Sequence, residues 1–155
     1  MKNLLLLFAA LFFSVTGFAQ SAQEEVDLIQ SMYGMQKKEI VANFIKLEGA
    51  QKDAFWKLYD AYEVERKALG MRRINLLGDY AENYGTLDDA KIDAMVKEMN
   101  DLGLKNDKLI SSYYGKMKKP AGIKAAAQFT QIEYYLLSTI RAEILEEIPF
   151  IGELD

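Results

Sequence analysis

The chain has 155 residues, with 19 basic and 23 acidic side chains and a formal net charge of −4. This acidic balance argues against a nucleic-acid partner, because such binding depends on neutralising phosphates. The sequence contains no Cys and no His, which excludes disulfides, thiol chemistry and the commonest general base and transition-metal ligand. We therefore expect no catalytic residues, no metal and no cofactor.

The N-terminal residues have the pattern of a secretory signal peptide. Lys2 supplies a positive charge, residues 4–13 are continuously apolar, and Gly17 and Ala19 form a small-x-small cleavage site. The apolar run is shorter than the roughly 20 residues that a membrane-spanning helix needs. We predict a signal peptide at 1–19, a single helical domain at 20–155, and a periplasmic or secreted location.

The rest of the sequence reads as helix almost throughout. Apolar residues recur at steps of three and four, and the chain has two Pro, so long helices can run uninterrupted. The predicted helices are 24–45, 48–84, 87–117 and 123–148. Each has one apolar side, and short connections make consecutive helices antiparallel. The predicted fold class is all-α, with four helices of which the two long ones form an antiparallel hairpin.

The turn of that hairpin is predicted at residues 85–86. Gly85 lacks a Cβ and so favours a left-handed C-cap at the end of the second helix. Thr86 offers a hydroxyl oxygen as N-cap of the third helix, and Asp88 and Asp89 place negative charge in its first turn.

Charged side chains are expected on the outer faces of the helices. Lys37, Lys38 and Glu39 are interpreted as a solvated patch. The basic segment 66–73 is expected to form surface ion pairs, which are worth about 0–1 kcal/mol each. Its candidate partners on the same and adjacent helices are Glu63, Glu65 and Asp79.

Candidates for catalysis are weak. A di-iron bundle needs Glu-x-x-His motifs, which a chain without His cannot form. Three glutamates within 143–147 are interpreted as a solvated face, with an oxygen-ligand calcium site as the alternative. A Ser–Lys pair is conceivable where Ser111 and Ser112 follow Lys105 and Lys108. A pair of carboxylates acting as acid and base also stays open, but we predict that the chain is not an enzyme.

The aromatic and methionine content favours a protein-binding surface instead. The sequence holds nine Tyr and seven Met, and these side chains suit surfaces that accept varied partners, because Tyr is amphipathic and Met adapts its shape. The predicted binding residues along the second helix are Trp56, Tyr59, Tyr62, Met71, Tyr80 and Tyr84.

Leu47-Glu48-Gly49-Ala50-Gln51 has the L-x-x-x-Q spacing of the LTxxQ motif. The chain thereby resembles the Spy/CpxP-like periplasmic proteins, and the order of signal peptide, short helix, motif and long hairpin resembles theirs over most of its length. Glu48 stands where the motif has Thr, and a second copy at 123–128 is degenerate because its Gln comes one residue late. Leu47 suits the position of a hydrophobic staple just before the helix.

The resemblance implies an elongated, cradle-shaped helical protein, often a homodimer. It also implies an ATP-independent chaperone or envelope-stress accessory, whose partners are unfolded or partly folded envelope proteins. The alternative is a regulatory or sensor subunit that binds one dedicated membrane partner. An enzyme based on two carboxylates is a third hypothesis.

Overall fold

The computed structural model describes residues 34–153. The predicted signal peptide at 1–19 lies outside the described residues, as does the part of the first predicted helix that precedes residue 34. None of the described helices is both long enough and apolar enough to cross a membrane.

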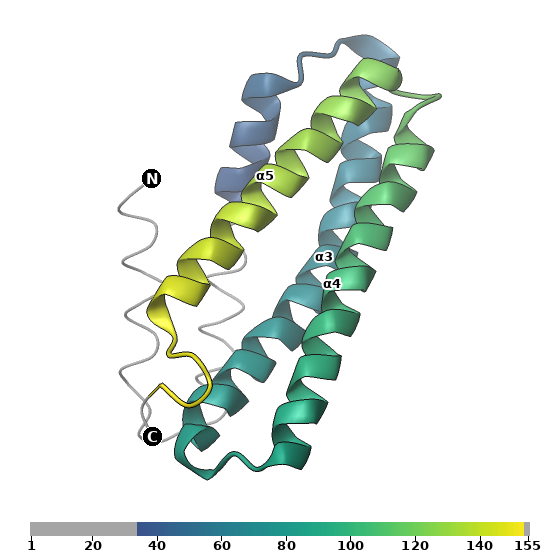
Figure 1. Cartoon of the computed structure of the whole chain (residues 1–155). Helices are drawn as coiled ribbons and strands as arrows, with labels where there is room; N and C mark the ends of the chain where they lie inside the picture. The colour runs from purple at the N-terminus through teal and green to yellow at the C-terminus, as the bar shows by residue number, and fades with distance from the viewer. Residues whose placement is uncertain (1–33, 154–155) are drawn as a thin grey trace.

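The described residues form helices joined by short connections, and no strand occurs among them. A helix at 34–44 is followed by α3 (Gly49–Asn83), the short 3-10 helix η2 (Tyr84–Thr86), α4 (Asp89–Met117) and α5 (Ile123–Glu147). The two long helices α3 and α4 lie side by side as an antiparallel hairpin (Figure 1). The predicted fold class is therefore confirmed.

The hairpin turn differs from the prediction in both of its caps. Gly85 lies within η2 and is not among the glycines with a positive φ, so the predicted left-handed C-cap is wrong. Thr86 is not the N-cap of α4, since its hydroxyl donates to the carbonyl of Asn83 at 3.1 Å. Asp88 is the N-cap, and its carboxylate accepts from the Lys91 amide at 2.8 Å. A 3-10 turn extends α3 before the chain reverses.

The predicted motif residues stand where α3 begins. Glu48 is the N-cap with an extended backbone, and Leu47 before it packs against the buried core, as a staple residue would. Gln51 is exposed, and its side-chain nitrogen lies near Gly122, the residue that precedes α5 with φ +92°. The start of α3 therefore lies beside the turn between α4 and α5.

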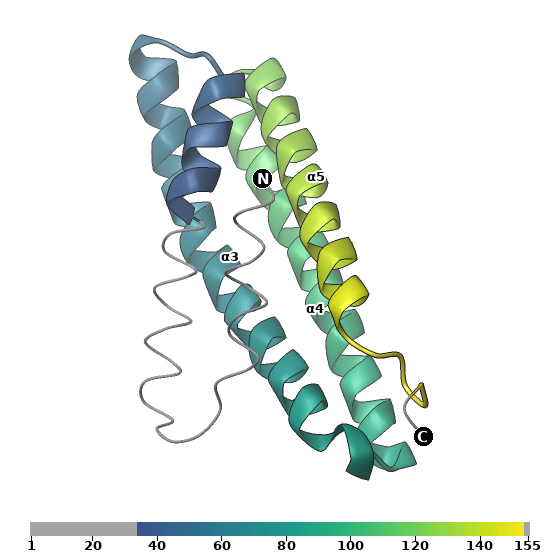
Figure 2. The ribbon, with the colours of Figure 1, turned by 90° about the vertical axis from the view of Figure 1, so that its left-hand side faces the viewer.

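Side-chain contacts fix how the helices pack. Tyr62 of α3 meets the ring of Tyr113 of α4 in an edge-to-face arrangement, and further along, Arg72 of α3 pairs with Glu98 of α4. Residue numbers thus rise along α3 while they fall along α4. Lys37 reaches both α3 and α5 from the helix at 34–44. That helix covers one end of the bundle (Figure 2).

The two ends of the bundle are packed differently. The main buried cluster belongs to the end that carries the helix at 34–44, and we call residues 34–66 with 102–133 the packed half. The open half comprises 67–83 of α3, 89–101 of α4 and 134–147 of α5. Among its described side chains, Leu77 and Tyr80 alone are buried.

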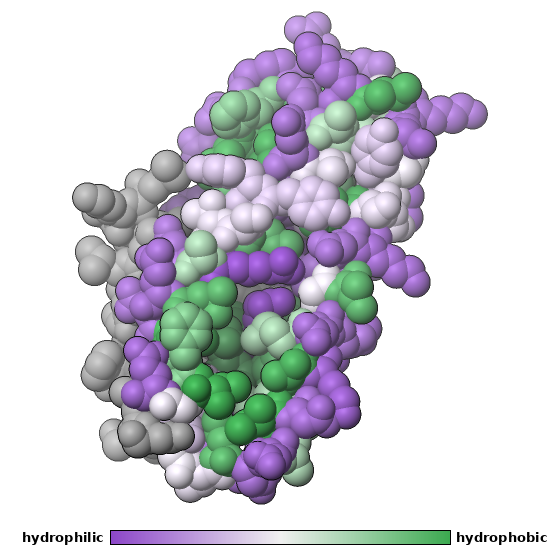
Figure 3. Space-filling model, viewed as in Figure 1, coloured by the Kyte–Doolittle hydropathy of each residue, from purple (hydrophilic) through white to green (hydrophobic). Residues whose placement is uncertain are grey.

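Most apolar side chains of the open half are therefore only partly covered. Figure 3 shows hydrophobic side chains gathered around a recess in the lower part of the molecule, with hydrophilic side chains at its upper end. The half-buried apolar residues of this half include Leu69, Met71, Ile74, Leu76, Ile92, Met95, Met99, Leu136, Leu137, Ile140 and Ile144.

Candidate functional site

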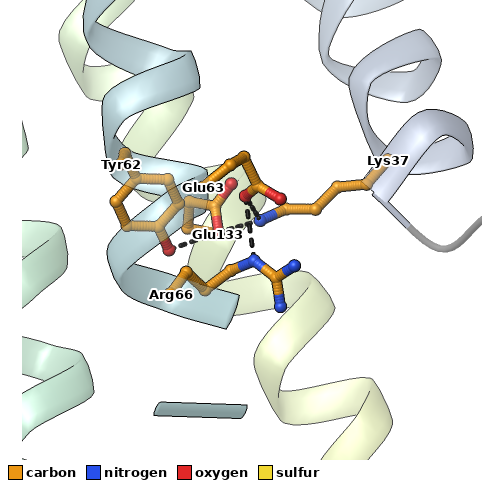
Figure 4. A network of polar contacts seen from close by, with 5 residues as sticks. All are labelled: Lys37, Tyr62, Glu63, Arg66 and Glu133. Carbon is orange, nitrogen blue, oxygen red and sulfur yellow. Dashed lines mark hydrogen bonds and ion pairs between the residues drawn. The ribbon is translucent and has the colours of Figure 1, made fainter. Parts of the chain in front are cut away.

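A network of ionised side chains lies inside the bundle where the packed half meets the open half. Lys37 donates to an oxygen of Glu133 at 2.6 Å and to an oxygen of Glu63 at 2.7 Å. The Tyr62 hydroxyl donates to the same Glu133 oxygen at 2.6 Å, and Arg66 Nε donates to Glu63 at 2.9 Å (Figure 4). The network therefore joins the helix at 34–44, α3 and α5.

Breaking this network is energetically unfavourable, because its charged side chains are buried. The exposed fractions of the Lys37 and Glu133 side chains are 2% and 3%. Two cations, Lys37 and Arg66, balance two carboxylates, and the Lys37 ammonium also lies 5.1 Å from the centre of the Tyr62 ring. The second oxygen of each carboxylate is buried without a hydrogen bond. The hydrogen bonds and ion pairs to the first oxygen must therefore offset the unfavourable desolvation of both acids.

The net pKa shifts of the two carboxyl groups have opposite directions. Burial raises the pKa of Glu63, but the nearby charges of Lys37 and Arg66 and their hydrogen bonds outweigh it, so the net pKa is below its ordinary value. Burial also raises the pKa of Glu133, and there the opposing effects of Lys37 and Tyr62 are too small to reverse it. Burial, followed by the charge of Glu133, raises the pKa of Tyr62 as well.

The interpretation of Lys37, Lys38 and Glu39 as a solvated patch is wrong for Lys37. Val41 and Ile45 follow it at steps of four and are buried in the core, so Lys37 lies on the inner stripe of its helix. Lys38 and Glu39 are exposed. Glu133 follows the buried Phe129 at the same spacing. Extending the apolar period through charged positions would have found both residues.

The predicted binding residues divide between the core and the surface. Tyr59 and Tyr62 are fully buried in the packed half, where their rings meet Phe129 edge-on at 6.3 and 5.0 Å. As placed, they hold the core together and present no surface to a partner. Trp56 is half-buried, and Lys38 lies 5.2 Å from its ring centre.

The other three predicted residues belong to the open half. Met71 and Tyr84 are half-buried, and Tyr80 is 9% exposed. The hydroxyls of Tyr80 and Tyr84 donate to the carbonyls of Pro149 and Phe150, each at 2.7 Å. These bonds hold the segment that follows α5 against the end of α3.

The basic segment pairs only in part as expected. Arg66 pairs with Glu63, one of the predicted partners, whereas Arg72 pairs with Glu98 and Asp101 of α4. Arg73 forms no ion pair with any described residue, and its Nη1 lies 2.9 Å from the Met99 sulfur. No group of three or more acidic side chains within residues 34–153 is placed to hold a metal ion.

Comparisons of the chain with protein-family models, with curated proteins and with solved structures find no match. The resemblance based on Leu47 and Gln51 therefore stays a prediction.

Lys37→Met tests the network. The variant leaves two buried carboxylates without their shared cation, so we expect the free energy of unfolding to fall by about 3–5 kcal/mol. Urea unfolding followed by circular dichroism measures this. The matched control is Lys38→Met, which removes a solvent-exposed pair with Asp60 and should cost about 0–1 kcal/mol. Equal losses in the two variants would contradict the structural role of the network.

The lowered pKa of Glu63 predicts a specific pH dependence. Its ionised form stabilises the folded state above the ordinary glutamate pKa of 4.5, and this contribution is lost as pH falls through the lower folded-state pKa. Glu63→Gln should therefore be less stable than the wild type at pH 7, and the difference should shrink below about pH 4.5. The exposed Glu39→Gln should follow the wild-type profile, and a Glu63→Gln deficit independent of pH would refute the assignment.

Proposed function

We propose that the chain binds exposed apolar segments of other proteins in the cell envelope and, without nucleotide, keeps them from aggregating. The observation that carries the proposal is the uneven packing of the bundle. The apolar faces of α3, α4 and α5 continue through the open half, where their side chains are half-buried around a recess.

Partly buried apolar side chains can still lose solvent-exposed surface when a partner binds. Removing apolar surface from water is favourable by about 25 cal/mol per Å². A partner that covers the half-buried side chains of the open half would therefore bind with a favourable hydrophobic free energy. The methionine side chains Met71, Met95 and Met99 adapt to partners of different shape. A surface of this kind supports binding to apolar segments of varied sequence.

The ionised network supports a role in holding the fold. Its members are enclosed between three helices, with Lys37 and Glu133 almost fully buried and their charges balanced by neighbours. A buried and internally paired arrangement offers no open position for a substrate, so the open half is the better candidate for function.

The test is suppression of aggregation. An unrelated denatured protein is diluted into buffer without ATP, and light scattering is followed with and without the purified chain. We expect suppression at near-equal stoichiometry. No suppression by a chain shown to be folded would contradict the proposal and would direct the search to one dedicated partner.

A pair of variants locates the surface. Ile140→Ser and Ile144→Ser together remove apolar area from the open half, and we expect suppression to require several-fold more chain. The control is Ile123→Ser on the same helix, whose side chain is 67% exposed at the opposite end of the bundle. Equal activity of the double variant and the wild type would exclude the open half as the binding surface.

A further inference from the structure

Two arginines of the open half have no acidic partner among residues 34–153. Arg73 comes from α3 and Arg141 from α5, and both side chains are half-buried. The Nε and Nη2 atoms of Arg141 are buried and form no hydrogen bond. Neither residue makes an ion pair within residues 34–153, whereas Arg66 and Arg72 on α3 are both paired.

This arrangement is unfavourable as it stands. A guanidinium group stays charged in proteins, and removing part of it from water without a counterion is unfavourable. The two arginines also repel each other. Burial lowers the pKa of Arg73, and the positive charge of Arg141 lowers it further. An anion between them would relieve both the desolvation and the repulsion.

Apolar residues flank both arginines along their helices. Leu69 and Leu77 lie one turn to either side of Arg73 on α3, and Leu137 and Ile144 lie about one turn to either side of Arg141 on α5. All four are buried or half-buried. Figure 3 shows hydrophobic side chains around the recess and hydrophilic side chains at one end of it.

The segment after α5 lies against the C-terminal end of α3. The hydrogen bonds from Tyr80 and Tyr84 to Pro149 and Phe150 hold that segment against α3. From Leu69 to Tyr80, α3 rises by about 16 Å at 1.5 Å per residue. This length suits one alkyl chain.

We propose that the open half binds a long-chain fatty acid, with its carboxylate between Arg73 and Arg141 and its alkyl chain along the apolar lining. Guanidinium groups bind carboxylates through paired, charge-assisted hydrogen bonds. The site is a small-molecule site and does not depend on the proposed protein-binding function.

The experiment is isothermal titration calorimetry of the purified chain with dodecanoate below its micelle concentration, compared with dodecanol. We expect dodecanoate to bind with one-to-one stoichiometry and dodecanol to bind more weakly. Arg141→Met should weaken dodecanoate binding about tenfold or more, as the loss of a charge-assisted hydrogen bond implies. Arg72→Met removes a neighbouring surface arginine and should leave dodecanoate binding unchanged.

A second measurement separates binding from folding. Because Arg141 has no acidic partner within residues 34–153, Arg141→Met should unfold at the same temperature as the wild type or higher. A clear loss of thermal stability would show that Arg141 has a structural role and would overturn the proposal. So would equal affinity for dodecanoate and dodecanol, or the absence of dodecanoate binding. Displacement of dodecanoate by an acidic apolar peptide that binds more tightly would assign the recess to a protein segment instead.

Discussion

The Lys37 ammonium group, held between Glu63 and Glu133, is the contact on which the arrangement of the bundle depends. A buried ion pair adds little net stability compared with apolar residues of the same volume, but leaving either charge unpaired is costly. Any packing in which the helix at 34–44, α3 and α5 do not meet at this point would leave a buried charge unpaired and is therefore unfavourable. Tyr62 and Arg66 add hydrogen bonds that fix the orientation of the two carboxylates.

The position of this network also divides the molecule in two. On one side of it, aromatic rings of α3 and α5 and small residues at the start of α5 form a closed core. On the other side, α3, α4 and α5 continue with the same apolar periodicity, but the described helix at 34–44 does not extend there. The apolar stripes of the open half are thus left partly exposed. Fold and proposed function follow from the same feature, because the surface that the core does not use is the surface available to a ligand.

The fold was predictable because its determinants are local. Apolar steps of three and four and the scarcity of Pro specify long helices, and short connections specify their antiparallel order. The turn was less predictable. Gly85 permits a left-handed cap without requiring one, and the chain instead forms a 3-10 turn with Asp88 as the N-cap. Leu47 could be placed correctly because its packing depends on its position just before a helix.

The site was harder to predict, because its contacts join residues that are far apart in the sequence. Lys37 and Glu133 are separated by 96 positions, and only their shared place on inner helix faces connects them. The aromatic residues Tyr59 and Tyr62 share a helix with Tyr80 and Tyr84, and composition could not assign one pair to the core and the other to the end of the hairpin. The proximity of Arg141 on α5 to Arg73 on α3 could not be predicted from any local sequence pattern.

The most direct test of the account is hydrogen–deuterium exchange of the unliganded chain, resolved along α3, α4 and α5. Uneven packing predicts slow exchange for backbone amides of the packed half and faster exchange through local opening for those of the open half. Within α3, the change should occur just beyond Arg66, where the ionised network ends. Uniform protection along all three helices would contradict the division into two halves and, with it, the proposed binding surface.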